Sequence, residues 1–88
     1  MKINPEFIAR EIAGELVIVP VGEAAKNSDQ LISANEVGAF IWNALAAGKS
    51  LDETVAAILE EFEIDGQTAR ADAEQFISEL KEIGAIIE

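Results

Sequence analysis

The first third of the chain carries an extended pattern of apolar positions. Residues Phe7 to Ile12 and Glu15 to Val21 are rich in β-branched and apolar side chains, and Ala13-Gly14 between them favours a tight turn. Pro20 cannot donate a ladder hydrogen bond, so it suits the end or the edge of a strand better than its centre. This pattern predicts a β-hairpin.

A polar connection, a third strand and a first helix are predicted next. Residues 22–30 are mostly small and polar, and within them 24–26 could form one helical turn. The short run from Leu31 to Ala34 is interpreted as a third strand. It stops at Asn35, a favoured N-cap residue, after which apolar residues recur with helical spacing until Gly48.

The second half of the chain predicts two further helices. Ser50-Leu51-Asp52-Glu53 has the capping-box pattern, in which the two outer side chains each satisfy a free backbone N–H group. The helix behind it is expected to end at 64–66. A last helix should start near Asp65 or Thr68 and run to about Ile83.

The order of these elements predicts an α+β fold, with a three-stranded antiparallel sheet followed by three helices. Residues 85–87 could add a short further strand. The chain has 88 residues, which is too few for two hydrophobic cores, so a single domain over residues 1–88 is expected. The apolar fraction of 50% agrees with a compact core rather than a disordered chain.

The absence of two residue types removes many kinds of catalytic and metal-binding site. Without Cys or His, the chain lacks thiolate nucleophiles, imidazole bases and the usual ligands of zinc. Carboxylates are abundant, but they fall mostly on the predicted solvent faces of the helices. We therefore expect no catalytic residue, no metal site and no cofactor, and a protein that is not an enzyme.

The charge of the chain limits its partners. The formal net charge is −11 and there are only six Lys and Arg residues, which disfavours binding to nucleic acid and to anionic membranes. No apolar run approaches the roughly 20 residues that span a bilayer, and the N-terminal residues do not resemble a secretory signal. A cytoplasmic location is expected.

One strand-to-helix junction and the helices behind it resemble a known family. Between Leu31 and Trp42 an apolar strand is followed by Asn-Glu and then by Gly and Ile-Trp on the first helix, as in PqqD-type proteins. The capping box at Ser50, the aromatic Phe62 and the segment from Thr68 to Asp72 match the later helices in order and spacing. The chain thus resembles the PqqD family over nearly its whole length, although Ala34 stands where the family often has a larger aliphatic residue.

This resemblance implies both a fold and a role. The fold of the family is a winged helix-turn-helix variant, and its members act in the biosynthesis of ribosomally made, modified peptides, including PQQ-type biosynthesis. By resemblance, the leader segment of a precursor peptide would add as an antiparallel strand to the third strand, beside the third helix. The protein would be a peptide chaperone that presents the precursor to a modifying enzyme, often a radical-SAM enzyme, with no cofactor of its own.

A candidate binding site follows from this mode of recognition. A third strand with a free edge offers unpaired backbone groups to an extended peptide. The third helix would add a small and apolar strip with charges at both ends, at i, i+3, i+4 and i+7 spacing. The candidate peptide-binding residues are Leu31, Ile32, Ser33, Ala34, Arg70, Ala73, Glu74, Ile77 and Lys81.

Other interpretations of the same features stay open. Leu31, Ile32 and Ile77 could simply belong to the core, and Arg70 could pair with Glu74 at i+4. A winged-helix DNA-binding regulator would share the fold, but it requires a basic recognition helix, and the third helix here is acidic. A structural homodimer could instead pair strand edges or exchange the hairpin between chains.

Overall fold

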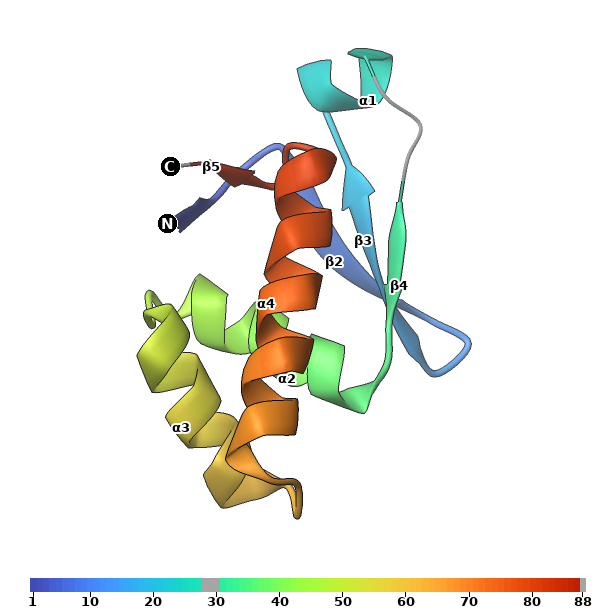
Figure 1. Cartoon of the computed structure of the whole chain (residues 1–88). Coiled ribbons are helices and arrows are strands. Elements are labelled where there is room, and N and C mark those ends of the chain that lie inside the picture. The colour runs from blue at the N-terminus through green and yellow to red at the C-terminus, as the bar shows by residue number, and fades with distance from the viewer. Residues whose placement is uncertain (28–30, 88) are drawn as a thin grey trace.

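The structure is a computed structural model that describes residues 1–27 and 31–87. The predicted polar connection therefore lies partly outside the described residues, at 28–30, and the helical turn predicted at 24–26 falls within a short helix. In chain order (Figure 1) the elements are β1 (Lys2–Ile3), β2 (Phe7–Ile12), β3 (Glu15–Pro20), α1 (Glu23–Asn27), β4 (Ile32–Ala34), α2 (Glu36–Ala46), α3 (Leu51–Glu61), α4 (Gly66–Glu82) and β5 (Ile86–Ile87).

The three-stranded antiparallel sheet has the order β2-β3-β4, so the predicted hairpin and third strand are confirmed. The hairpin turns at Ala13 and Gly14, which both have positive φ, of 53° and 84°. This backbone matches the right-handed twist of the two strands, which is why two-residue hairpins favour it. Pro20 lies at the end of β3, where the missing N–H group is tolerated.

A second, two-stranded sheet joins the two ends of the described chain. β1 pairs with β5 in antiparallel register, with Lys2 opposite Ile87 and Ile3 opposite Ile86. Asn4 extends the contact, because its side-chain amide donates to the Gly84 carbonyl at 3.0 Å. The short C-terminal strand was predicted, whereas β1 was not, because β1 is defined by its pairing with residues more than eighty positions later in the chain.

The predicted helix starts are confirmed by their capping hydrogen bonds. The Asn35 side chain accepts from the Gly38 N–H group at 2.8 Å at the start of α2. Ser50 and Glu53 form the complete capping box at the start of α3, with hydrogen bonds of 3.1 and 2.9 Å. Asp65 caps α4. Local sequence therefore determines where each long helix begins.

Helix α3 ends at Glu61, a few residues before the predicted end at 64–66. The backbone of Phe62 is extended, with φ −122° and ψ 151°. The Phe62 ring packs edge-on against Phe40 of α2, with 5.4 Å between the ring centroids. This aromatic contact, which the local sequence does not reveal, accompanies the earlier end of the helix.

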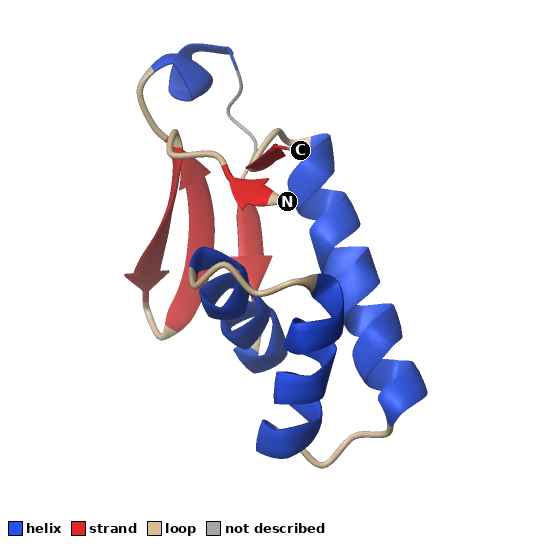
Figure 2. Ribbon diagram, turned by 90° about the vertical axis from the view of Figure 1, so that its left-hand side faces the viewer, coloured by secondary structure: helices blue, strands red, loops and turns tan. Residues whose placement is uncertain are grey.

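The hydrophobic core lies between one face of the sheet and helices α2, α3 and α4, which Figure 2 shows on the same side of the strands. The sheet and each of these three helices contribute a fully buried large side chain. These are Ile18, Ile41, Ile58 and Leu80, each at most 1% exposed. The predicted α+β class, a sheet packed with three long helices, is confirmed. The opposite face of the sheet carries no described helix.

Candidate functional site

The strand β4 forms one edge of the three-stranded sheet. It pairs with β3 on one side, and no strand of the described chain pairs with its other side. Side chains alternate along it: Ile32 and Ala34 face the core, whereas Ser33 faces outward and its hydroxyl donates to a Glu15 carboxylate oxygen at 3.3 Å. Leu31, just before the strand, is 57% exposed.

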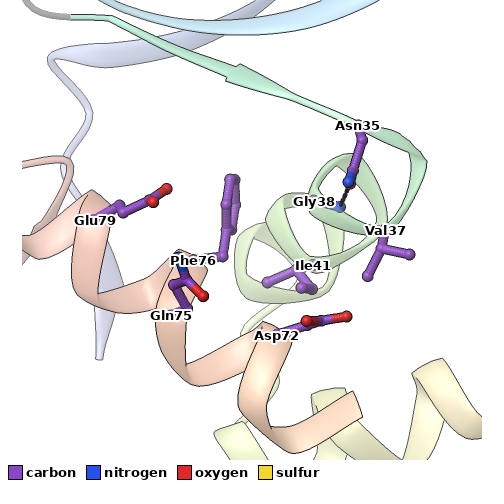
Figure 3. A pocket seen from close by; sticks show the side chains of 8 residues that line it. All are labelled: Asn35, Val37, Gly38, Ile41, Asp72, Gln75, Phe76 and Glu79. Atoms are coloured by element: carbon purple, nitrogen blue, oxygen red, sulfur yellow. Dashed lines mark hydrogen bonds between the residues drawn. The ribbon is translucent and has the colours of Figure 1, made fainter. Parts of the chain in front are cut away.

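A groove of about 230 Å³ opens between Asn35, which directly follows β4, the first turns of α2 and the middle of α4 (Figure 3). Its floor is apolar and consists of Val37, Ile41 and Phe76. Ile41 is only 1% exposed and Phe76 only 8% exposed, so both are held in place by the core. In Figure 3 the Phe76 side chain projects from α4 toward β4.

Gly38 allows the three elements around this groove to approach closely. A Cβ atom at this position would lie 3.1 Å from the Ala34 Cβ of β4 and 3.3 Å from the Phe76 ring of α4. Both distances are shorter than ordinary van der Waals contact. The absence of a side chain at Gly38, together with the small Ala34, therefore shapes the floor of the groove.

The rim of the groove is polar and acidic. It is formed by Asn35 at the start of α2 and by Asp72, Gln75 and Glu79 along α4. The three α4 side chains are exposed, and neither carboxylate has a hydrogen-bond or ion-pair partner among the residues that the structure describes. No Lys or Arg lines the groove. An open strand edge, an apolar floor and an acidic rim thus lie together.

Sequence comparison identifies the family of this chain. The model of the family described as coenzyme PQQ synthesis protein D matches residues 15–86, which include the sheet strands β3 and β4 and all three long helices. The chain belongs to the PqqD family. The resemblance found in the strand-to-helix junction is therefore confirmed. A comparison with curated proteins gave no match.

Two solved structures share the PqqD-family fold of this chain over essentially their whole length. The first is described as TbiB1 in complex with the TbiA(beta) leader peptide. It is 27% identical, with a TM-score of 0.75 and complete coverage of both chains. The second is described as lasso peptide synthetase B1 complexed with the leader peptide. It is 21% identical, with a TM-score of 0.80, and the match covers 99% of this chain and 96% of that one.

The structure places one part of the predicted site on the side of α4 that faces α3. Arg70 donates to Asp52 of α3 at 2.7 Å, and this hydrogen bond raises the pKa of the guanidinium. The predicted strip therefore turns toward α3, not toward β4. Ala73 is completely buried in the core. The other strip residues border a separate hollow, which is lined by Met1, Leu51, Glu74, Ile77, Ser78 and Lys81.

Helix geometry explains why the predicted strip and the groove residues lie on different sides of α4. Successive residues of an α-helix are rotated by about 100°, so Arg70, Glu74 and Lys81 lie on nearly the opposite flank of α4 from Asp72 and Glu79. The core stripe runs between the two flanks. The sequence defines that stripe but contains no local signal for which flank lies beside the sheet. The structure also places two residues for which a core position had been left open: Leu31 is exposed and Ile77 is buried.

Sequence reasoning assigned the floor residues of the groove to the core and did not connect them with a site. Val37, Ile41 and Phe76 have the helical spacing of core residues, and two of them are indeed buried. One feature of the sequence could have indicated the groove: Gly38 is a glycine inside a predicted helix, and such a residue often marks a close approach of another element. The spacing of Asp72, Gln75 and Glu79, at i, i+3 and i+7, is the second signal.

No group of three or more Asp or Glu side chains in residues 1–27 and 31–87 is arranged to hold a metal ion. No helix in this part of the chain is long and apolar enough to cross a membrane.

Proposed function

We propose that this PqqD-family protein binds the leader segment of a ribosomally synthesised precursor peptide, by strand addition on β4, and presents it to a modifying enzyme. The observation that carries the proposal is the open edge of β4 beside a groove with an apolar floor. Support comes from two solved structures of the same fold, whose descriptions each name a bound leader peptide.

Strand addition divides recognition between the backbone and the side chains. The unpaired N–H and C=O groups of an edge strand hold an extended peptide through main-chain hydrogen bonds, whatever its sequence. Every second side chain of that peptide points toward the same face, where pockets provide selectivity. Here Val37 and Phe76, packed over the buried Ile41, form the apolar floor for such side chains.

The groove residues replace part of the predicted site. From β4 and its approach we retain Leu31, Ile32, Ser33 and Ala34 as the peptide-pairing segment. From α4 the proposed contacts are Asp72, Phe76 and Glu79, in place of the strip that faces α3.

The proposed role is that of a binding partner and not of a catalyst. Of the titratable side chains that line the groove, Asp72 and Glu79 are both exposed and lie on the rim, away from the apolar floor. A general acid or base is usually placed where burial or a charged neighbour tunes its pKa. The modifying enzyme, of the radical-SAM class by family resemblance, would supply the chemistry.

The test is an amide-resolved NMR titration of the labelled protein with the leader segment of a short peptide encoded beside its gene. We expect chemical-shift changes concentrated on Leu31 to Ala34 and on the Asp72 to Glu79 flank of α4. Shifts confined to the α3 side of α4, or no shifts at high peptide excess, would exclude strand addition on β4.

A pair of tryptophan variants sharpens this test. Gln75→Trp places a large side chain on the rim of the groove, and we expect it to weaken leader binding by roughly tenfold or more, because it occupies the space beside β4. Ser78→Trp is the matched control, since Ser78 is also exposed on α4 but borders the hollow on the α3 side. Equal binding by both variants would contradict the proposed groove.

A further inference from the structure

The charge of the groove rim indicates which leader peptides it favours, an inference that rests on the proposed function. Asp72 and Glu79 are the charged groups that line the groove, and both are acidic and exposed. None of the six Lys and Arg residues lines the groove: Arg70 is paired with Asp52, Lys26 is paired with Glu23, Lys81 borders the hollow on the α3 side, and Lys2, Arg10 and Lys49 line none of the three hollows. A peptide entering the groove therefore meets two carboxylates without a cation to offset them.

Further carboxylates surround the same end of β4. A second hollow shares Asn35 with the groove and lies between the hairpin and α2. Its lining includes Glu11, Glu15 and Glu36 but no Lys or Arg. With a formal net charge of −11, the whole molecule also produces a negative field that attracts basic segments and repels acidic ones.

The geometry of α4 sets the spacing of the charges that would pair with this rim. α4 runs antiparallel to β4, with Asp72 near the C-terminal end of the strand and Glu79 toward its N-terminal end (Figure 3). At about 1.5 Å per residue, the two carboxylates start roughly 10 Å apart along the helix. A strand covers that distance in about three residues, and its side chains return to one face every second residue.

We propose that the leader segment bound by this groove carries lysine or arginine at two positions, two or four residues apart, on the face turned toward α4. An antiparallel peptide on β4 runs in the same direction as α4. The first basic residue therefore pairs with Asp72 and the second with Glu79. The apolar side chains of the segment contact the floor at Val37 and Phe76.

The experiment selects binders from a displayed library of random short peptides at low salt. The baits are the wild-type protein, the charge reversal Asp72→Lys/Glu79→Lys, and the control reversal Glu60→Lys/Glu63→Lys. The control residues are exposed: Glu60 lies in the last turn of α3 and Glu63 lies just after the helix ends. They line none of the three hollows described above, and both reversals change the net charge equally. NMR amide shifts of Ile32 to Ala34 then establish which selected peptides bind at β4.

We expect the wild-type and control proteins to enrich Lys or Arg at the stated spacing, and the groove reversal to enrich Asp or Glu instead. Basic peptides selected on the wild type should bind the groove reversal roughly tenfold more weakly, and this difference should shrink as salt is added.

Two outcomes would overturn the inference, and they are distinguishable. Peptides that shift the β4 amides but show no basic enrichment, and bind the groove reversal as well as the wild type, would exclude the charge preference and leave strand addition intact. If none of the selected peptides shifts the β4 amides, the proposed function fails and the inference fails with it.

Discussion

At Gly38, helix α2 lies in close contact with both β4 and α4. The Gly38 N–H group donates to the N-cap Asn35, so the same residue completes the helix start and leaves room for Ala34 and Phe76. Two of the features that led to the PqqD resemblance, the Asn-Glu pair and the following glycine, thus have a physical role in this structure. They position the start of α2 against the edge strand.

Substituting Gly38 by Ala is expected to destabilise the protein by about 1 kcal/mol. Ala improves helix propensity by up to about 1 kcal/mol, but overpacking of a tight contact typically costs roughly 1 to 3 kcal/mol, and both neighbours here are constrained by the core. Urea denaturation measures the difference. Gly66→Ala is the control, because a Cβ atom there would meet only the Leu59 side chain at 4.0 Å, so it should be neutral or stabilising.

A loss of stability of similar size in both glycine variants would show that the crowding at Gly38 is not the cause. The Gly38→Ala variant should also bind the leader segment less well than Gly66→Ala, since the added methyl group lies at the floor of the groove.

At the scale of the elements, the helix caps carry the clearest pH dependence. Asp65 accepts from the Thr68 N–H group at 2.7 Å, and this backbone hydrogen bond lowers the pKa of Asp65 below its ordinary value of 3.8. Because the folded pKa is the lower one, the cap stabilises the protein above about pH 3.8 and this contribution is lost as the pH falls through the folded pKa. Glu53 behaves in the same sense, through its hydrogen bond with Ser50.

We expect Asp65→Asn to keep the stability of the wild type near neutral pH and to lose less of it on acidification. Asn is as good an N-cap as Asp but does not titrate in this range. The measurement is the urea midpoint of both proteins at about pH 7 and about pH 3, because the difference between proteins cancels the titration of the many other acids. Asp65→Ala, which removes the cap, should be less stable already at neutral pH; an Asn variant as acid-sensitive as the wild type would contradict this role.

Sequence predicted the elements that depend on neighbouring residues and missed those that depend on distant ones. The hairpin turn at Ala13-Gly14, the caps at Asn35 and Ser50, and a helix start near Asp65 or Thr68 are local arrangements, and all were predicted. β1 exists because it pairs with β5 more than eighty residues later. Which flank of α4 lies beside β4 likewise depends on the packing of the whole molecule, so the sequence could not show that the predicted helix strip faces α3.

At the scale of the molecule, the acidic surface bears on the DNA-binding alternative. The exposed positions of α4 carry more carboxylates than cations. The carboxylates are Asp72, Glu74, Glu79 and Glu82, and the cations are Arg70 and Lys81. Arg70 is moreover paired with Asp52. A helix of this charge is poorly suited to a phosphate backbone.

We therefore expect no retardation of duplex DNA in an electrophoretic mobility shift assay at low salt, where phosphate contacts are strongest. A salt-sensitive shifted band at moderate protein concentration would favour the regulator instead. The homodimer alternative stays a prediction, which concentration-dependent light scattering tests, since β2 and β4 are both edges of the sheet.

The pairing of β1 with β5 has a consequence for how the domain can be connected to other proteins. The two ends of the described chain lie side by side, on the opposite side of α4 from β4 (Figure 1). A linker attached to either end leaves the molecule without crossing the groove. An enzyme joined by such a linker would therefore meet a leader peptide bound in the groove at an effective concentration set by the linker length. The same fold would serve equally as a separate protein or as a module fused to an enzyme.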